Sequence, residues 1–239
     1  MINRITLNPV TYVHDLLYLL FPDVCAGCKS PLLRQENTIC LKCTANLPRT
    51  LMEMEDDNPI IKLFWGRCLV EKGCAVYTYN KGGLLQRLIY ELKYKQNHFV
   101  GDKLGKLAAH ILLENNFTQD IDVLIPVPLH PKKEKIRGYN QSEMICKGLS
   151  EVSSIAYETK YLSRSVHTGS QTKKDSMSRW ENVAKIFAVH HAQELEGKHI
   201  LLVDDVITTG ATMEACIHQL KKIEGCRVSV FALGSSAGI

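Results

Sequence analysis

From residue 74 onward, the hydrophobic and polar positions alternate between strand-like and helix-like patterns. Apolar runs rich in β-branched residues predict buried strands at 74–79, 121–128, 198–206 and 227–233. Between and after them, apolar residues recur at helical spacing in 84–94, 103–115, 141–152 and 211–223. Strands that alternate with helices predict right-handed crossovers, and therefore an α/β fold with a mostly parallel sheet flanked by helices.

The N-terminal segment contains one dense apolar run, Leu16–Phe21. It is too short to cross a bilayer, and no basic start or small-residue cleavage site accompanies it. We therefore expect a short amphipathic helix, no membrane span and no signal peptide. A cytoplasmic protein follows, in which thiols stay reduced.

A polar stretch after Pro48, MEMEDDNP, contains four acids in eight residues and ends on Asn-Pro. Such a composition is typical of a turn or linker. We therefore predict an N-terminal helix and small module at 1–52, a connecting segment at 53–73 and an α/β domain at 74–239.

Four of the nine cysteines form two C-x-x-C pairs separated by eleven residues: Cys25, Cys28, Cys40 and Cys43. Two such turns supply the tetrahedral four-sulfur shell that zinc favours. A redox dithiol would explain one pair but not two, and iron remains an alternative to zinc. Because all four ligands come from the protein, we expect a structural Zn²⁺ site without an open position for substrate.

Composition and net charge exclude few classes of function. The hydrophobic fraction of 45% is ordinary for a globular protein, and the net charge of +4 is too small to argue for nucleic-acid binding.

The most informative stretch is LLVDDVITTGAT, residues 201–212. Here a buried strand runs into two acids, then a Thr/Gly loop, and then a helix whose N-terminus faces the ligand edge of the sheet. Hydroxyls, a glycine and a helix N-terminus favour a phosphate group, and the two acids favour hydroxyl groups beside it. This pattern predicts a sugar-phosphate site, with a divalent cation as a further component. The alternative is a generic strand–turn–helix with chance acids, and no other phosphate-binding motif is present.

VDDVITTGAT resembles the 5-phosphoribosyl-1-pyrophosphate (PRPP) motif of type I phosphoribosyltransferases. The resemblance implies that Asp204 and Asp205 bind the ribose hydroxyls. It further implies a 5′-phosphate loop made of Thr208, Thr209, Gly210, Ala211 and Thr212. Segments 125–143 and 162–187, together with the four-cysteine module, resemble the ComF subfamily of late-competence proteins, which are linked to DNA uptake. The implied architecture is a type I phosphoribosyltransferase-like sheet preceded by a small zinc-binding module.

Other parts of the site are implied less directly. In the family, the loop after the strand at 121–128 grips pyrophosphate, which suits Arg137 and Gly138; for Lys132, Lys133 and Lys135, pyrophosphate and nucleic acid stay open as partners. Segment 164–182 resembles the flexible loop that closes over PRPP, with Arg164, Gln171, Arg179 and Asn182 as its polar residues; an exposed loop is the alternative. Lys93 lies near a predicted helix end, where its charge complements the helix dipole, and a role toward substrate stays open.

The resemblance implies that the protein binds PRPP with Mg²⁺ and that a nitrogen acceptor displaces pyrophosphate from C1 of the ribose. Asp204, Asp205 and Arg137 would be the catalytic residues, while the acceptor and turnover itself stay open. One alternative is a non-catalytic protein that binds single-stranded DNA, with Trp65, Trp180 and Tyr139 as stacking residues. Another is a structural zinc adaptor that docks to a partner such as a DNA-uptake helicase.

Overall fold

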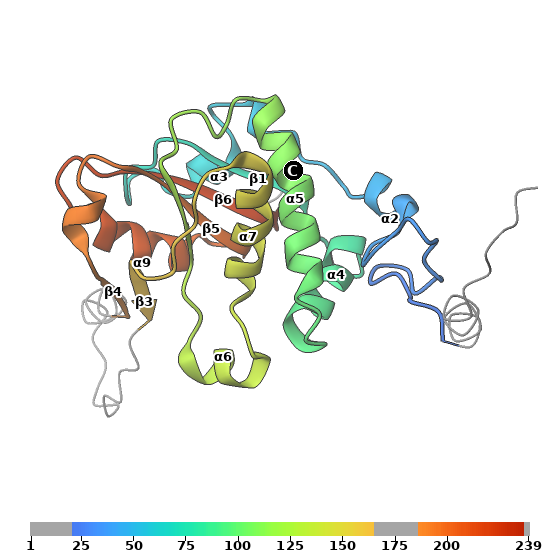
Figure 1. Ribbon diagram of the computed structural model, residues 1–239. Helices are drawn as coiled ribbons and strands as arrows, with labels where there is room; N and C mark the ends of the chain where they lie inside the picture. Colours follow the sequence, from blue (N-terminus) through green and yellow to red (C-terminus); the bar gives the residue numbers. More distant parts are fainter. Residues whose placement is uncertain (1–20, 165–185, 237–239) are drawn as a thin grey trace, which may run out of the picture.

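The computed structural model describes residues 21–164 and 186–236, and its centre is a four-stranded parallel sheet (Figure 1). The strand order is β1-β6-β5-β2. The strands are β1 (Gly73–Thr78), β2 (Val123–Pro126), β5 (His199–Ile207) and β6 (Arg227–Ser235). Because the paired strands are parallel, their carboxyl ends meet at one edge of the sheet, where ligands bind in folds of this kind.

Four longer helices pack around this sheet: α4 (Leu84–Tyr94), α5 (Phe99–Glu114), α7 (Gln141–Ser153) and α9 (Ala211–Leu220). Each has an apolar stripe that it buries, such as Leu85, Leu88, Ile89 and Leu92 on α4. The helices lie between the strands in chain order, so the predicted mostly parallel α/β fold is confirmed.

Shorter elements complete the described part of the chain. They are helices α2 (Leu41–Ala45), α3 (Pro59–Lys62) and α6 (Pro131–Arg137), the 3-10 helices η1 (Met52–Met54) and η2 (Ala192–Leu195), and the antiparallel pair β3 (Leu162–Arg164) and β4 (Phe187–Val189). These were not predicted from the sequence. They span three to seven residues, which is too short for a periodic pattern.

Both edges of the sheet are covered by irregular chain. On the β1 edge, the Thr50 N–H donates to the carbonyl of Val76, and the Thr78 N–H donates to that of Pro48. On the β2 edge, Leu124 exchanges backbone hydrogen bonds with segment 156–158. The connection between the N-terminal module and the sheet is therefore itself an antiparallel addition to the sheet, which also protects an otherwise open edge.

Two sequence-based expectations need correction. The segment after β2 is not a loop, because Pro131 and the His130 side chain start helix α6, which ends at Gly138 with φ 84°. The strand that carries the acid pair ends later than predicted, at Ile207 instead of residue 206, because β6 pairs with β5 along its whole length.

In the described residues, no helix is both long and apolar enough to cross a membrane. The helix expected around Leu16–Phe21 lies almost wholly outside these residues.

Helices α5 and α7 lie side by side and touch through glycines (Figure 1). A Cβ atom at Gly148 of α7 would lie 2.1 Å from the carbonyl oxygen of Asp102, and one at Gly105 of α5 would lie 2.3 Å from that of Ile145. Neither helix backbone can move aside without disturbing its packing on the sheet.

We therefore expect Gly148→Ala to lower the free energy of unfolding by about 2 kcal/mol. Overpacking costs about 1–3 kcal/mol and outweighs the gain of about 1 kcal/mol in helix propensity. Urea unfolding measures this difference, with Lys147→Ala at the exposed neighbouring position as the control. Equal stability of Gly148→Ala and the wild type would contradict the close approach of the two helices.

Candidate functional site

The two acids of the candidate site lie in the last four residues of β5, at the carboxyl edge of the sheet. Asp204 Oδ1 accepts hydrogen bonds from the Ser142 hydroxyl, at 2.9 Å, and from the Asp205 N–H, at 2.8 Å. Ser142 stands at the start of α7, where the Asn140 side chain caps the helix. The first turn of α7 is thereby attached to the end of β5.

Asp205 is only 6% exposed and forms an ion pair with Lys93, whose Nζ lies 2.8 Å from Asp205 Oδ1. Lys93 belongs to the last turn of α4. Because its charged group reaches the acid pair, complementing the helix dipole is not its only role. The structure thus places Lys93 in the candidate site, where the sequence left its role open.

Burial and the neighbouring Asp205 carboxylate together raise the pKa of Asp204 to about 7. The hydrogen bonds from Ser142 and the Asp205 N–H act in the opposite direction and limit the rise. Near neutral pH, the free acid pair therefore holds a proton for part of the time.

The candidate phosphate loop, Thr208–Gly210, connects β5 to α9. Gly210 has φ 74°, a conformation that L-residues with side chains rarely adopt, and it lies against the buried ring of Phe64. Thr208, Thr209 and Thr212 are exposed, so their hydroxyls are accessible to a ligand. The N–H groups in the first turn of α9 add to an environment that suits an anion, although that of Ala211 also donates weakly to the Thr209 hydroxyl oxygen at 3.5 Å.

Arg67 holds this loop in place through contacts that could not be foreseen from the sequence. Its guanidinium donates to the carbonyl of Thr209 at 3.0 Å, donates to the carbonyl of Leu63, and pairs with the buried Glu214 of α9 at 2.8 Å. Phe64 and Arg67 both belong to segment 53–73, which we expected to be only a connection. A lone arginine in a turn carries no recognisable pattern, so only the fold could reveal this contact.

Arg137 and Gly138 are not in contact with the acid pair. The Arg137 guanidinium lies 5.4 Å from the ring centroid of Tyr94, and Gly138 ends helix α6. The next residue, Tyr139, donates its hydroxyl to the carbonyl of Leu92. Both side chains therefore dock on the last turn of α4, the same turn that carries Lys93.

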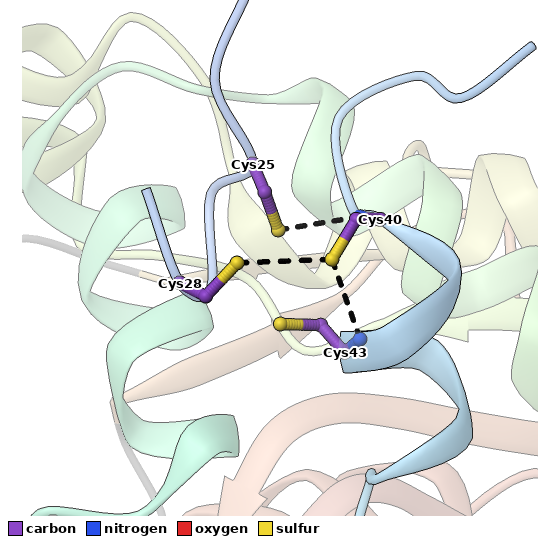
Figure 2. A group of neighbouring side chains, drawn as sticks. All are labelled: Cys25, Cys28, Cys40 and Cys43. Carbon is purple, nitrogen blue, oxygen red and sulfur yellow. Dashed lines mark hydrogen bonds between the residues drawn. The ribbon is translucent and has the colours of Figure 1, made fainter. Parts of the chain in front are cut away.

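The four predicted metal ligands do come together: the ligand sulfurs of Cys25, Cys28, Cys40 and Cys43 all lie within 4.8 Å of one another. Figure 2 shows them pointing toward a common centre. The Cys28 and Cys40 sulfurs are 3.7 Å apart, and a regular tetrahedron with zinc–sulfur bonds of about 2.3 Å has edges of about 3.8 Å. Backbone N–H groups of Gly27, Cys40 and Cys43 point at cysteine sulfurs, as they do around thiolate ligands. The donor set therefore fits a four-coordinate metal.

Of the residues predicted for a flexible loop, Arg164 lies at the end of strand β3, opposite Phe187 of β4. Gln171, Arg179 and Asn182 lie outside the described residues, as does Trp180. Trp65 is 61% exposed, with Lys62 Nζ 5.6 Å from its ring centroid.

Comparison with solved structures gives partial overlaps. The allosteric regulatory enzyme of purine biosynthesis matches with a TM-score of 0.42 and 23% identity, over 57% of this chain and 26% of that one. Adenine phosphoribosyltransferase from Saccharomyces cerevisiae matches with a TM-score of 0.34 and 14% identity, over 65% and 70%.

Comparison with protein sequences gives longer matches. DNA utilization protein YhgH of Escherichia coli (strain K12) is 26% identical over 235 residues, which cover 90% of this chain and 98% of the relative. Competence protein ComFC of Bacillus subtilis (strain 168) is 28% identical over 226 residues, with 91% and 87% covered. Competence protein F of Haemophilus influenzae is 28% identical over 153 residues, with 62% and 67% covered.

The family described as "Phosphoribosyl transferase domain" matches residues 142–234, which include Ser142, both acids and the Thr/Gly loop. The chain is therefore a homologue of the DNA utilization and competence proteins, and it carries a phosphoribosyl transferase domain behind a four-cysteine module.

Proposed function

We propose that this protein binds PRPP with Mg²⁺ and acts in the uptake or use of DNA in the cytoplasm. The observation that carries the first part is the acid pair beside the Gly210 loop, at the carboxyl edge of a parallel sheet, with Asp205 buried and Asp204 partly buried. The names of the relatives, which refer to DNA utilization and competence, support the second part.

In this proposal, Asp204 and Asp205 accept hydrogen bonds from the ribose 2′- and 3′-hydroxyls. The Ser142 hydroxyl holds the Asp204 carboxylate and Lys93 holds the Asp205 carboxylate, so both acids are positioned before the sugar binds. Thr208–Gly210 and the start of α9, with Ala211 and Thr212, hold the 5′-phosphate. Arg137 and Gly138 serve the pyrophosphate end, where Mg²⁺ would neutralise charge.

The reaction that such a site serves is transfer of the phosphoribosyl group to a nitrogen acceptor. The C1–O bond to pyrophosphate breaks, a C1–N bond forms, and the proton of the acceptor nitrogen leaves to solvent. No nucleophilic side chain is needed, because the site works by positioning and charge stabilisation. Turnover is separate from binding and is measured as pyrophosphate release.

A specific feature also supports a nucleic-acid role. Lys132, Lys133 and Lys135 are all exposed on α6, a helix without buried residues that projects from the body of the protein (Figure 1). Exposed cations on one short helix suit a phosphate backbone, and binding through them would weaken steeply with salt. A protein that docks to a helicase through its zinc module would lack this salt dependence.

We further propose that the four-cysteine module holds one structural Zn²⁺. The module has few buried residues of its own, so the metal would supply much of its folding free energy. It is fastened to α4 by a hydrogen bond from Arg87 Nε to the carbonyl of Gly27 at 3.0 Å and by the Lys29–Glu91 ion pair at 2.7 Å.

Purified protein should contain one zinc per chain, and Cys25→Ser should lose it, because a four-coordinate structural site needs all four sulfurs. Inductively coupled plasma mass spectrometry gives the metal content. Cys68→Ser, at a half-buried cysteine outside the cluster, is the matched control and should retain zinc. Iron in place of zinc, or a folded metal-free wild type, would refute the assignment.

The acid pair should determine PRPP affinity. In calorimetric titration with PRPP and Mg²⁺, we expect Asp204→Asn/Asp205→Asn to bind at least about 100-fold more weakly than the wild type, because hydrogen bonds to charged groups contribute about 1.5–3 kcal/mol each. The chain offers a matched control in Asp56→Asn/Asp57→Asn, an adjacent acid pair that is exposed. If folded, zinc-loaded wild type fails to bind PRPP, the DNA-binding or adaptor role becomes the better explanation.

The proton on Asp204 should appear in the pH dependence of stability. A carboxyl whose folded pKa is raised from 3.8 to about 7 keeps its proton in the folded protein while the unfolded chain loses it. The free energy of unfolding of the wild type should therefore fall, relative to Asp204→Asn, as pH rises from about 4 to about 7. The relative slope should approach about 1.4 kcal/mol per pH unit. Urea unfolding across this range provides the measurement, and parallel curves for the two proteins would rule out the raised pKa.

A further inference from the structure

A cavity of about 920 Å³ lies between the four-cysteine module and helix α4. Residues 26–29 of the first cysteine turn form one wall, and residues 86–94 of α4 form the other. Tyr79, just beyond the end of β1, completes the lining. The cavity therefore exists only because the module is fastened to α4.

The cavity adjoins the acid pair. Lys93 lines the cavity, and its Nζ donates a hydrogen bond to Asp205, so this side chain belongs to both the cavity and the acid pair. Lys93 is therefore the link between the cavity and the proposed ribose site. A second substrate has to bind on a neighbouring surface of this kind for its nitrogen to reach C1.

The walls of the cavity suit a flat ring. Tyr79, Tyr90 and Tyr94 all contribute to its lining, and Tyr90 and Tyr94 are 50% and 62% exposed. The ring centroids of Tyr90 and Tyr94 are 5.1 Å apart at an angle of 41°, so they are not stacked face to face. Among the described residues, no hydrogen bond is recorded for these three phenol groups. Exposed aromatic faces with free polar ends are the usual means of holding a heterocycle.

The charges of the lining favour an uncharged ligand, because every cation there already has a partner. Lys29 pairs with Glu91, Lys93 pairs with Asp205, and Arg87 donates to the carbonyls of Gly27 and Gly82. With zinc bound, the ion and the four thiolates, Cys28 among them, would together carry a net charge of about −2, so an additional anion would gain little.

The exposed Cys28, which lines the cavity, offers main-chain polar groups to a ligand. Among the described residues, neither its N–H nor its C=O has a backbone partner. A main-chain donor and acceptor in one residue match a ring edge that carries an acceptor and a donor. The volume exceeds the need of a single ring and lies near the upper end of the range for small-molecule pockets.

We propose that this cavity binds the second substrate, an uncharged two-ring nitrogen heterocycle, and that the four-cysteine module forms one wall of its site. This inference rests on the proposed function, because a second substrate presupposes PRPP. It gives the module a role in substrate binding in addition to its structural one.

The test uses the full zinc-loaded chain and three probes in calorimetric titrations: adenine or guanine, PRPP with Mg²⁺, and the corresponding nucleoside 5′-monophosphate, which would span both places. Tyr90→Ala should weaken the free base and the monophosphate about tenfold, since stacking of a base on an aromatic ring contributes that much or more. It should leave PRPP affinity unchanged. Trp65→Ala, at an exposed aromatic residue outside the cavity, is the control and should change none of the three.

The acid-pair variant separates this inference from the proposed function. Asp204→Asn/Asp205→Asn should weaken PRPP and the monophosphate but leave the free base unaffected. Wild type that binds PRPP but neither base, with or without PRPP present, overturns the cavity assignment alone. Base binding that Tyr90→Ala and Tyr94→Ala both leave intact overturns it as well. Base binding without PRPP binding would instead overturn the proposed function.

Discussion

Two adjacent carboxylates at the end of a buried strand are unfavourable unless each has a partner, and the architecture of this protein provides those partners from three directions. Ser142 comes from the first turn of α7, Lys93 from the last turn of α4, and the Asp205 N–H from the strand itself. Removing one partner of a buried carboxylate leaves its charge unpaired in a medium of low dielectric constant, which is strongly destabilising. The acid pair therefore constrains α4, α7 and β5 to one arrangement.

That constraint extends outward through α4. Its last turn holds Asp205 through Lys93, accepts the Tyr139 hydroxyl at Leu92 and carries Tyr94 beneath the Arg137 guanidinium. Its earlier turns hold the four-cysteine module through Arg87 and Glu91. One helix thus connects the proposed ribose site, the proposed pyrophosphate segment and the four-cysteine module, so a shift of α4 would affect all three.

The sequence predicted the parts whose physical causes are local. Strand β5, helix α9 and the four cysteines are each encoded by a periodicity or spacing within a short window, and the end of α4 at Tyr94 was predicted to the residue. Arg67 and the partner of Lys93 could not be predicted, because their contacts join positions more than a hundred residues apart. Helix α6 was missed for a different reason. It buries no residue, so it has no apolar stripe, and only its capping residues and Pro131 marked it.

The same distinction between local and long-range contacts explains why the sequence alone could not indicate the acceptor, the proposed second substrate. A ribose-phosphate site is built on one strand–loop–helix, and its chemistry can be read in twelve consecutive residues. The cavity beside it is built from a cysteine turn, the residue after β1 and one side of α4, which meet only in the folded chain. None of these pieces has a motif of its own. Because the Lys29–Glu91 and Arg87–Gly27 contacts join the cysteine turn to α4, a metal held by the four cysteines would also shape the cavity wall. Loss of a bound zinc would therefore be expected to disturb the cavity first, and to reach the acid pair only through a shift of α4 that Lys93 would transmit to Asp205.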